Sequence, residues 1–271
     1  MLFYYQKIEM RISIITVSYN SGNTLSNTIE SVLSQGFSDI EYIIVDGCSK
    51  DGTTAIIKSA ESSFNGRLKW VSEPDKGLYD AMNKGIKMAT GDVIGILNSD
   101  DLFYDSNVLR DIALAFDENT DALFGNLYFV KSDDVHCIVR AWKGSTYSSF
   151  KKGWHPAHPT FYVRREVYEK YGGFDISFDV SADFELMLRF IEKNRIRTKY
   201  LDRYMVKMRM GGESTRNIAN IIRGNRNIIR AFRKNDIQVS WAYPIYRLFP
   251  KVVSLLRYKF CLLYTSDAAD E

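Results

Sequence analysis

The chain has 271 residues, 45% hydrophobic and 25% charged, a composition that excludes disorder as its main state and is typical of a globular protein with a sizeable core. Its 36 Lys and Arg against 33 Asp and Glu give a formal charge of +3, which excludes the concentrated basic character of a dedicated nucleic-acid-binding protein. The cysteines Cys48, Cys137 and Cys261 are scattered without metal-type spacing, so we expect neither a disulfide framework nor a zinc site but a reducing, cytoplasmic setting.

The first half of the sequence alternates between strand and helix patterns. Apolar runs predict strands over residues 11–19, 41–47, 68–73 and 91–101, and helical spacing predicts helices over residues 23–36, 49–62, 78–91 and 106–116. Strands separated by helices of this length pair in parallel through right-handed crossovers. We therefore expect an α/β fold with a Rossmann-like, mostly parallel central sheet flanked by helices.

The pattern changes after Asp121. Residues 121–130 and 135–142 form successive predicted strands with no helix between them, which indicates mixed pairing. A stretch rich in Pro, His and aromatic residues then leads to a helix, and a second helix begins near Asp183. No linker interrupts this region, so we expect one domain over residues 1–215 and a helical extension over residues 216–260.

Polar residues follow each predicted strand of the first half. They are Thr16, Ser18 and Asn20, then Asp46, then Glu73, Asp75 and Lys76, and finally Asn98, Asp100 and Asp101. Ligands of open α/β sheets bind beyond the carboxyl ends of strands, although any one of these residues taken alone is more typical of a turn or a helix cap.

The adjacent acids Asp100 and Asp101 repel each other unless a cation or hydrogen-bond donors relieve them. Mg²⁺ binds one or two carboxylates together with substrate phosphates, so the pair suggests a nucleoside diphosphate ligand. The glycine-rich loops of dinucleotide-binding enzymes and of nucleoside triphosphatases are absent, as is the GxSxG turn of hydrolases.

Six segments, in this order, resemble an inverting glycosyltransferase of family 2 with the GT-A fold, of the type that builds bacterial exopolysaccharide, capsule or O-antigen. They are SIITVSYN, EYIIVDGCSKDGT, SEPDKGLYDAMNKGI, LNSDD, SADFELMLRF and MGGEST. The resemblance extends from about Arg11 to Ser214, and the third and fourth segments are its most specific parts.

The resemblance implies a role for each of these positions. Asp46 would hydrogen-bond the nucleotide base, with Thr16, Ser18 and Asn20 in the same pocket. Glu73, Asp75 and Lys76 would contact the base, ribose or diphosphate. Asp101 would hold Mg²⁺ or Mn²⁺, with Asp100 near the ribose or on a metal-bound water. Asn98 departs from the family pattern, which often has Asp there.

The resemblance also assigns Asp183 as the general base, which removes the proton of the attacking sugar hydroxyl. Without the resemblance, the more common interpretation of Asp183 is an acid near the start of a helix that the helix dipole stabilises. His158 would lie near the donor sugar, although a packed loop histidine is equally typical. His155 is a weaker candidate, and Trp154 fits either a sugar platform or the core. Gly211, Gly212 and Ser214 would form a loop over the nucleotide, from which Arg209 or Arg216 could reach the diphosphate.

Between Arg216 and Phe260 the sequence carries ten Lys and Arg against one acid, Asp236. In the helix predicted over 216–234, one arc holds Ile218, Ile221, Ile222, Ile229 and Phe232, and another holds the basic residues. The apolar arc fits packing on the domain and binding to an anionic membrane surface equally well. Membrane binding would place the acceptor, a polyprenyl-diphosphate-linked glycan, on the cytoplasmic leaflet.

The last eleven residues, CLLYTSDAADE, resemble translated adapter sequence, so we expect residues 261–271 to be non-native; Met10 is a second candidate start. The sequence thus predicts a metal-dependent, peripheral membrane glycosyltransferase that uses a nucleotide-diphospho-sugar, with UDP favoured, and that has no nucleic acid partner. The alternatives are a sugar nucleotidyltransferase and a non-catalytic sugar-nucleotide-binding component of a polysaccharide assembly complex.

Overall fold

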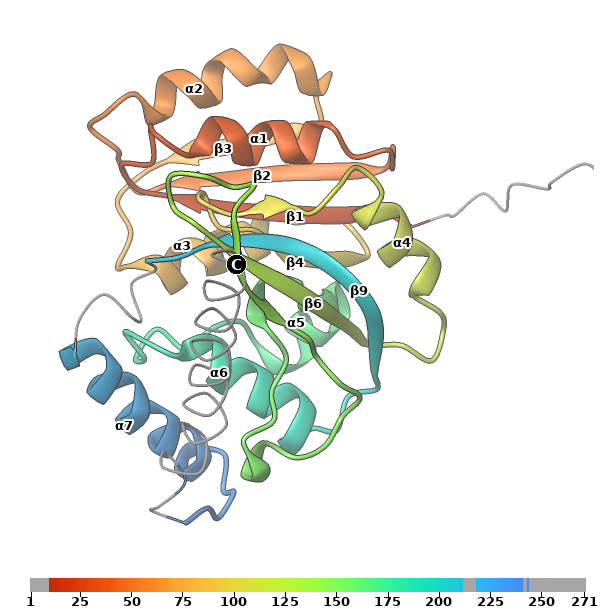
Figure 1. Ribbon diagram of the computed structural model, residues 1–271, viewed down its shortest axis with the longest axis vertical. Coiled ribbons are helices and arrows are strands. Elements are labelled where there is room, and N and C mark those ends of the chain that lie inside the picture. The colour runs from red at the N-terminus through yellow and green to blue at the C-terminus, as the bar shows by residue number, and fades with distance from the viewer. Residues whose placement is uncertain (1–9, 212–217, 241–242, 244–271) are drawn as a thin grey trace, which may run out of the picture.

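The computed structural model describes residues 10–211, 218–240 and 243 of the chain, and a nine-stranded sheet forms its centre (Figure 1). The strands are β1 (Ile12–Ser18), β2 (Ile40–Asp46), β3 (Leu68–Ser72), β4 (Val93–Ile96), β5 (Leu102–Phe103), β6 (Ala122–Val130), β7 (Ile138–Trp142), β8 (Tyr162–Arg164) and β9 (Thr198–Arg209). The α-helices are α1 (Leu25–Leu33), α2 (Thr53–Ala60), α3 (Leu78–Met88), α4 (Val108–Ala115), α5 (Arg165–Tyr171), α6 (Ala182–Met187) and α7 (Ile218–Lys234). Short 3₁₀ or π turns are η1 (Glu61–Phe64), η2 (Phe150–Lys152), η3 (His158–Thr160) and η4 (Leu188–Lys193).

The sheet has the strand order β3-β2-β1-β4-β8-β6-β9-β5, and β7 pairs with β6. The first four of these strands are parallel, whereas β8 is antiparallel to both β4 and β6. This confirms the predicted α/β fold and the mixed pairing expected in the second half.

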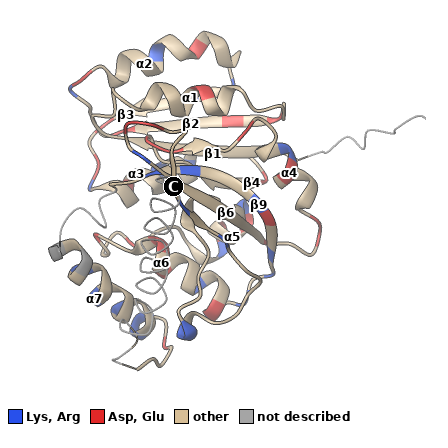
Figure 2. Ribbon diagram, viewed as in Figure 1, with Lys and Arg blue, Asp and Glu red and all other residues tan. Residues whose placement is uncertain are grey.

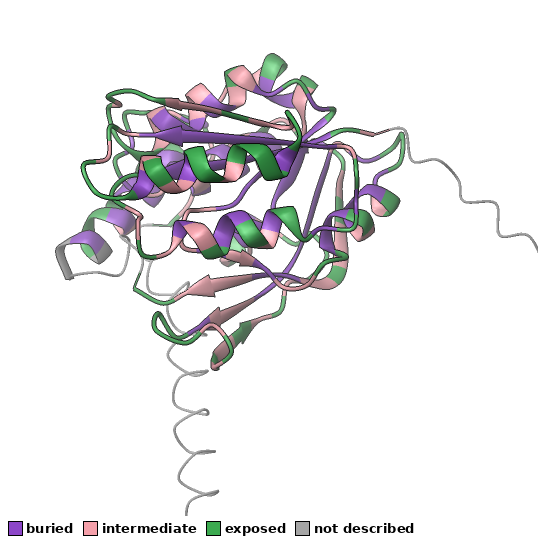
Figure 3. Cartoon of the chain, turned by 90° about the horizontal axis from the view of Figure 1, so that it is seen from above, coloured by how far each residue is buried: buried purple, intermediate pink, exposed green. Residues whose placement is uncertain are grey.

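Helices cover both faces of the sheet. Buried side chains of α1, α2 and α4 pack on one face, and those of α3, α5, α6 and α7 pack on the other. Every residue of β1 and of β2 is buried, and the strands form the buried interior in Figure 3. This explains why their sequences are continuously apolar instead of alternating.

The sequence analysis did not predict β9, which has 12 residues and inserts between β6 and β5. Its charged residues make the sequence TKYLDRYMVKMR atypical of a central strand, and most of its residues are only half-buried. The pairing of β6 with β9 shifts register on both sides of Asn126. A Cβ atom on Gly125 would lie 2.8 Å from the Arg203 carbonyl oxygen, so this close backbone approach requires glycine.

Helix α7 packs on the domain through part of the predicted arc and through the side next to it. Ile228, Ala231 and Phe232 are buried, and the Phe232 ring lies 5.6 Å from the ring of Phe184, whereas Ile222 is 49% exposed. Packing on the domain, one of the two alternatives for the arc, therefore holds for Phe232 and not for Ile222, and contact with α6 also buries Ile228 and Ala231 beside the arc.

Basic residues of α7 pair with the segment before α6. Arg223 Nη1 lies 2.7 Å from the Asp179 carboxylate, Arg230 Nη1 donates to the Ser177 carbonyl at 3.0 Å, and Lys234 forms an ion pair with Asp175. Figure 2 shows this basic helix beside the domain. Residues 244–260 of the predicted extension lie outside the described residues, as do residues 261–271, which we predicted to be non-native. In the part of the chain that is described, no helix is both long and apolar enough to span a membrane.

Candidate functional site at the carboxyl edge of the sheet

The carboxyl ends of β1, β2 and β3 lie side by side. Ser18 is in register with Asp46, and Asp46 is in register with Ser72. The backbone continues this alignment past the strands, because Gly47 N donates to the Ser18 carbonyl and Glu73 N to the Asp46 carbonyl. The structure thus brings three of the predicted polar segments to one edge of the sheet.

Asp46 is completely buried at this edge. Its carboxylate accepts hydrogen bonds from Ser18 Oγ at 3.1 Å, Ser72 Oγ at 2.6 Å, and both the backbone N and the Oγ of Ser49. A carboxylate offers about four lone-pair positions, so these donors occupy it. A ligand can therefore reach Asp46 only when one of the serine hydroxyls turns away.

Thr16 lies deeper in the sheet than the sequence analysis places it. Its side chain is completely buried, and its hydroxyl donates to the Leu97 carbonyl at 2.8 Å and accepts from Tyr42 at 3.1 Å. The expectation that the Thr16 side chain lines the pocket is therefore corrected. Its hydroxyl already donates one hydrogen bond and accepts another within the sheet.

Asn20 orders the loop after β1. Its backbone adopts a left-handed conformation with φ of 49°, which asparagine tolerates. Its side-chain Oδ1 accepts from Lys50 N at 2.9 Å, and its own N donates to Ser49 Oγ at 2.8 Å. Asn20 is exposed and joins the loops that follow β1 and β2.

The loop after β3 closes over the end of β2. A Cβ atom on Gly47 would lie 2.6 Å from Asp75 Oδ2, so a larger residue at position 47 would displace the Asp75 side chain. Asp75 Oδ1 accepts from Gly77 N, and Lys76 N donates to Asp80. Glu73 forms an exposed ion pair with Lys84 at 2.9 Å.

Asp100 and Asp101 lie at the end of β4, beside the end of β9. Asp101 is 1% exposed and accepts from Asn98 Nδ2 at 3.0 Å and from Arg209 N at 3.3 Å. The Arg209 guanidinium donates to the Asp100 carbonyl at 2.9 Å and to the Ser132 carbonyl at 2.7 Å. Burial raises the pKa of Asp100, and burial together with the Asp100 charge raises the pKa of Asp101 well above its usual range.

The two carboxylates suit a hard divalent cation. In the described part of the chain no cluster of three or more His, Cys, Asp or Glu side chains could hold a metal by itself. Mg²⁺ and Mn²⁺ do not require such a cluster, since they accept one or two carboxylates and take further oxygens from a bound phosphate. The donor chemistry of the pair fits a metal that binds together with a phosphate-containing ligand.

Asp183 opens helix α6 and faces helix α3. Tyr79 Oη donates to Asp183 Oδ1 at 3.3 Å, and the Tyr79 ring stacks on Phe174 with a centroid distance of 5.4 Å. His158 contacts Phe174 from its edge at 5.7 Å. Burial lowers the pKa of His158 and the Asp183 charge opposes that shift, which favours a neutral imidazole beside the carboxylate.

The sequence analysis assigned no role to Tyr79 or to Asn83, which connect the two sides of this site. Asn83 Nδ2 donates to the Phe174 carbonyl, and Phe174 N donates back to Asn83 Oδ1, both at 2.8 Å. A Cβ atom on Gly173 would lie 2.3 Å from Asn83 Oδ1. The available signal was that both residues lie in SEPDKGLYDAMNKGI, one of the most specific segments of the family resemblance.

The aromatic candidates form packed contacts. The Trp154 ring meets Phe124, Tyr147 and Phe150 edge to face, and its Nε1 donates to the Ser145 carbonyl at 3.3 Å. His155 lies between Trp142 and Phe184, at 5.2 and 5.6 Å. Of the predicted loop, Gly211 has φ of +108°, while Gly212, Ser214 and Arg216 lie outside the described residues.

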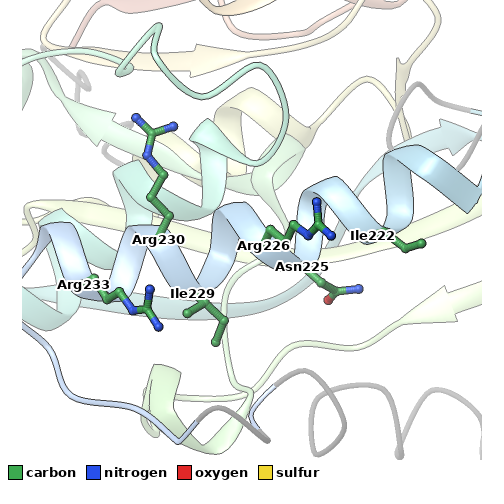
Figure 4. A pocket seen from close by; sticks show the side chains of 6 residues that line it. All are labelled: Ile222, Asn225, Arg226, Ile229, Arg230 and Arg233. Atoms are coloured by element: carbon green, nitrogen blue, oxygen red, sulfur yellow. The ribbon is translucent and has the colours of Figure 1, made fainter.

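A pocket of about 450 Å³ lies along α7 (Figure 4). The described side chains that line it are Ile222, Asn225, Arg226, Ile229, Arg230 and Arg233. None of the predicted site residues is among them, so this pocket is separate from the carboxyl-edge site.

Comparison with known families and proteins places these motifs in context. Residues 13–172 match the model of the glycosyl transferase family 2. The chain is 33% identical over 188 residues to an uncharacterized glycosyltransferase of Mycobacterium tuberculosis, covering 66% of this chain and 68% of the relative. It is 25% identical over 247 residues to a PGL/p-HBAD biosynthesis glycosyltransferase of Mycobacterium bovis, covering 89% and 92%.

Solved structures share the fold. S. aureus TarS 1-349 in complex with UDP matches with a TM-score of 0.63 at 21% identity, covering 87% of this chain and 68% of that one. The mannosyltransferase PcManGT from Pyrobaculum calidifontis, in complex with GDP-Man and Mn²⁺, matches with a TM-score of 0.61 at 19% identity, covering 97% and 76%. At these identities the likeness shows the fold, which is the GT-A arrangement expected from the sequence.

Asp100→Asn tests the metal assignment without an activity assay. Because the pKa values of both acids are raised, their ionised forms destabilise the fold at neutral pH, and this destabilisation disappears as the pH falls below those values. We expect the variant to melt about 2–4 °C higher than the parent in metal-free buffer, which corresponds to about 1 kcal/mol. We also expect it to lose most of the rise in melting temperature that Mn²⁺ with UDP or GDP gives the parent.

The exposed Glu118→Gln variant serves as the control, since it removes an acid far from the edge. An Asp100→Asn protein that Mn²⁺ and nucleotide stabilise as much as the parent would contradict the metal assignment.

Proposed function

Because the chain belongs to glycosyltransferase family 2, we propose that it transfers a sugar, with inversion, from a nucleotide-diphospho-sugar to a hydroxyl group of a glycan acceptor. One observation carries this proposal: the polar ends of β1 to β4 and the Asp100–Asp101 pair lie at one edge of the sheet, and α6 presents Asp183 next to α3.

The nucleotide base would bind where β1, β2 and β3 end. We propose that an imide N–H of the base replaces one serine hydroxyl on Asp46, because a hydroxyl rotates easily and a charged acceptor gains from a new donor. Ser18 and Asn20 would border this pocket, and Thr16 would support it from beneath. UDP is favoured since uracil offers the imide donor, and TarS has been crystallised with UDP.

The diphosphate would lie over the end of β4. Asp100 and Asp101 would hold Mg²⁺ or Mn²⁺, which supplies positive charge against the negative charge that grows on the leaving diphosphate. Asp75 and Lys76, in the loop that closes over Gly47, would contact the ribose and diphosphate, and Glu73 would fix that loop through Lys84. Arg209 would keep the two acids in place.

Asp183 would act as the general base for the acceptor hydroxyl. A carboxylate within reach of that hydroxyl takes its proton as the oxygen attacks the anomeric carbon, on the face opposite the leaving nucleoside diphosphate. Tyr79 would orient the carboxylate through its hydrogen bond, and the neutral His158 would border the donor sugar.

Helix α7 would bring the enzyme to an anionic membrane surface that carries a lipid-linked acceptor. Its side around the pocket combines the apolar Ile222 and Ile229 with Arg226 and Arg233, for which the described residues supply no hydrogen-bond or ion-pair partner. This mixture of apolar and basic side chains is typical of helices at lipid headgroups. Such a protein would work at the cytoplasmic face of a membrane in the synthesis of cell-surface polysaccharide.

Asp183→Asn tests the base assignment. The amide cannot take the proton but keeps the size of the side chain and an acceptor for Tyr79, so we expect kcat to fall at least about a hundredfold. The affinity for UDP-sugar with Mn²⁺, measured by calorimetry, should stay within about twofold of the parent. Normal transfer by this variant, with Glu166→Gln as the exposed control, would refute the role of Asp183.

Tyr79→Phe tests the orientation of the base. The phenyl ring keeps the stacking on Phe174 and loses only the hydrogen bond to Asp183, so we expect kcat to fall about tenfold, corresponding to about 1.4 kcal/mol. The donor KM and the melting temperature should not change, whereas Tyr171→Phe should leave all three unchanged. A higher donor KM with unchanged kcat would argue against this role.

Vesicle flotation tests the membrane proposal. We expect the protein to float with vesicles that contain phosphatidylglycerol and to remain unbound with pure phosphatidylcholine. Arg226→Gln together with Arg233→Gln should weaken binding about thirtyfold, at about 1 kcal/mol for each arginine. The pair Lys58→Gln and Arg195→Gln removes the same charge elsewhere, and equal losses from both pairs would contradict a specific surface.

A further inference from the structure

Arg140 on β7 occupies an unusual position for an arginine. It pairs across the hairpin with Phe129, and its guanidinium carbon lies 4.2 Å from the centre of the Phe129 ring. The side chain is half-buried, and burial lowers its pKa. An arginine in this setting has lost water around its charge.

The other half-buried arginines on the sheet and its helices all have partners that replace this water. The Arg203 guanidinium binds the carboxylates of Asp105 and Asp111, and that of Arg189 binds Glu185 and the Gly173 carbonyl. Arg164 donates to the carbonyls of Thr120 and Asp117. For Arg140 the described residues supply the Phe129 ring but no hydrogen-bond acceptor and no carboxylate.

Arg140 also lies at one end of a row of aromatic rings that reaches helix α6. Phe129 and Trp142 lie nearly parallel, with centroids 6.4 Å apart, and the Trp142 ring meets His155 at 5.2 Å. His155 then meets Phe184 at 5.6 Å, and Phe184 directly follows Asp183 in the chain. The row therefore connects Arg140 with helix α6, the helix that also carries Asp183.

The strand pairing places Arg140 at the same edge of the sheet as the donor site. Strand β9 occupies one side of β6 along its length, so β8 and β7 share the other side, which faces β4. Phe129, the partner of Arg140, is one residue from Val130, which is in register with Arg209. The Arg209 guanidinium already binds the Asp100 carbonyl beside the two acids. A second positive charge at this edge, that of Arg140, is therefore suited to a different anion.

We propose that Arg140 binds an anionic group of the acceptor, a phosphate or a carboxylate, and holds it while Asp183 activates the acceptor hydroxyl. This inference rests on the proposed transfer reaction. The planar guanidinium can donate two parallel hydrogen bonds to such a group, and the stacking on Phe129 fixes its plane in advance. On this proposal the acceptor carries a negative charge, which a neutral glycan does not supply.

The test measures anion binding to the full chain with saturating UDP or GDP and Mn²⁺, so that the donor's phosphate site is filled. Calorimetric titrations would use geranyl diphosphate as a lipid phosphate, methyl glucuronide as a sugar carboxylate, and methyl glucoside as the neutral control. We expect one of the two anions to bind and methyl glucoside not to bind. The anion that binds identifies the source of the charge.

Arg140→Gln should weaken binding of that anion by about tenfold to a hundredfold, the value typical of a lost charge-assisted pair. The anion affinity of Arg140→Lys should lie between that of Arg140→Gln and that of the parent, because lysine keeps the charge without the parallel donors. The anion affinity of the exposed Arg195→Gln variant should match that of the parent. The Kd for UDP or GDP should not change in any of them.

Two results would overturn the proposal. One is anion binding that is absent in the parent or equal in Arg140→Gln. The other is a loss of nucleotide affinity in Arg140→Gln, which would assign Arg140 to the donor diphosphate. Failure of the parent to bind any nucleoside diphosphate would instead count against the proposed function, and the same anion titrations without nucleotide would still decide the role of Arg140.

Discussion

Two neighbouring carboxylates, Asp100 and Asp101, lie in a largely buried position after the end of β4, and Arg209 at the end of β9 partly compensates for their charge. Strand β9 runs parallel to β6 and ends with Arg209, whose backbone N–H binds Asp101 and whose guanidinium binds the Asp100 carbonyl. Burial raises the pKa of both acids, and the charge of Asp100 raises the pKa of Asp101 further. A buried pair of carboxylates of this kind is suited to a cation.

The donor and acceptor sides of the site are joined through helix α3. One end of this helix follows the loop that closes over Gly47, where a nucleotide would bind. Its Tyr79 reaches Asp183 on α6, and its Asn83 holds the backbone of Phe174 by two hydrogen bonds. In the proposed mechanism this helix would set the distance between the leaving group and the base, which in-line transfer requires.

The basic residues of α7 fall into two groups. Arg223 and Lys234 pair with acids of the segment before α6, and Arg230 donates to Ser177, so these residues attach the helix to the domain. Arg226 and Arg233 flank a pocket on the same helix. Of the predicted apolar arc, Phe232 and Ile229 pack on the core, and the pairs with Asp175 and Asp179, acids distant in sequence, hold the helix in that orientation.

The sequence by itself determined the parallel α/β core, since continuous apolar strands and periodic helices are local patterns, and it identified the polar residues at the strand ends. It did not reveal β9, because a half-exposed, charged strand has no distinctive local pattern. Only the tertiary structure decided that Thr16 is buried within the sheet, that serines cover Asp46, and that Tyr79 contacts Asp183. It also decided that Arg140 packs on an aromatic ring with no carboxylate partner among the described residues. These facts depend on which segments pack together, and that depends on contacts between residues far apart in the chain.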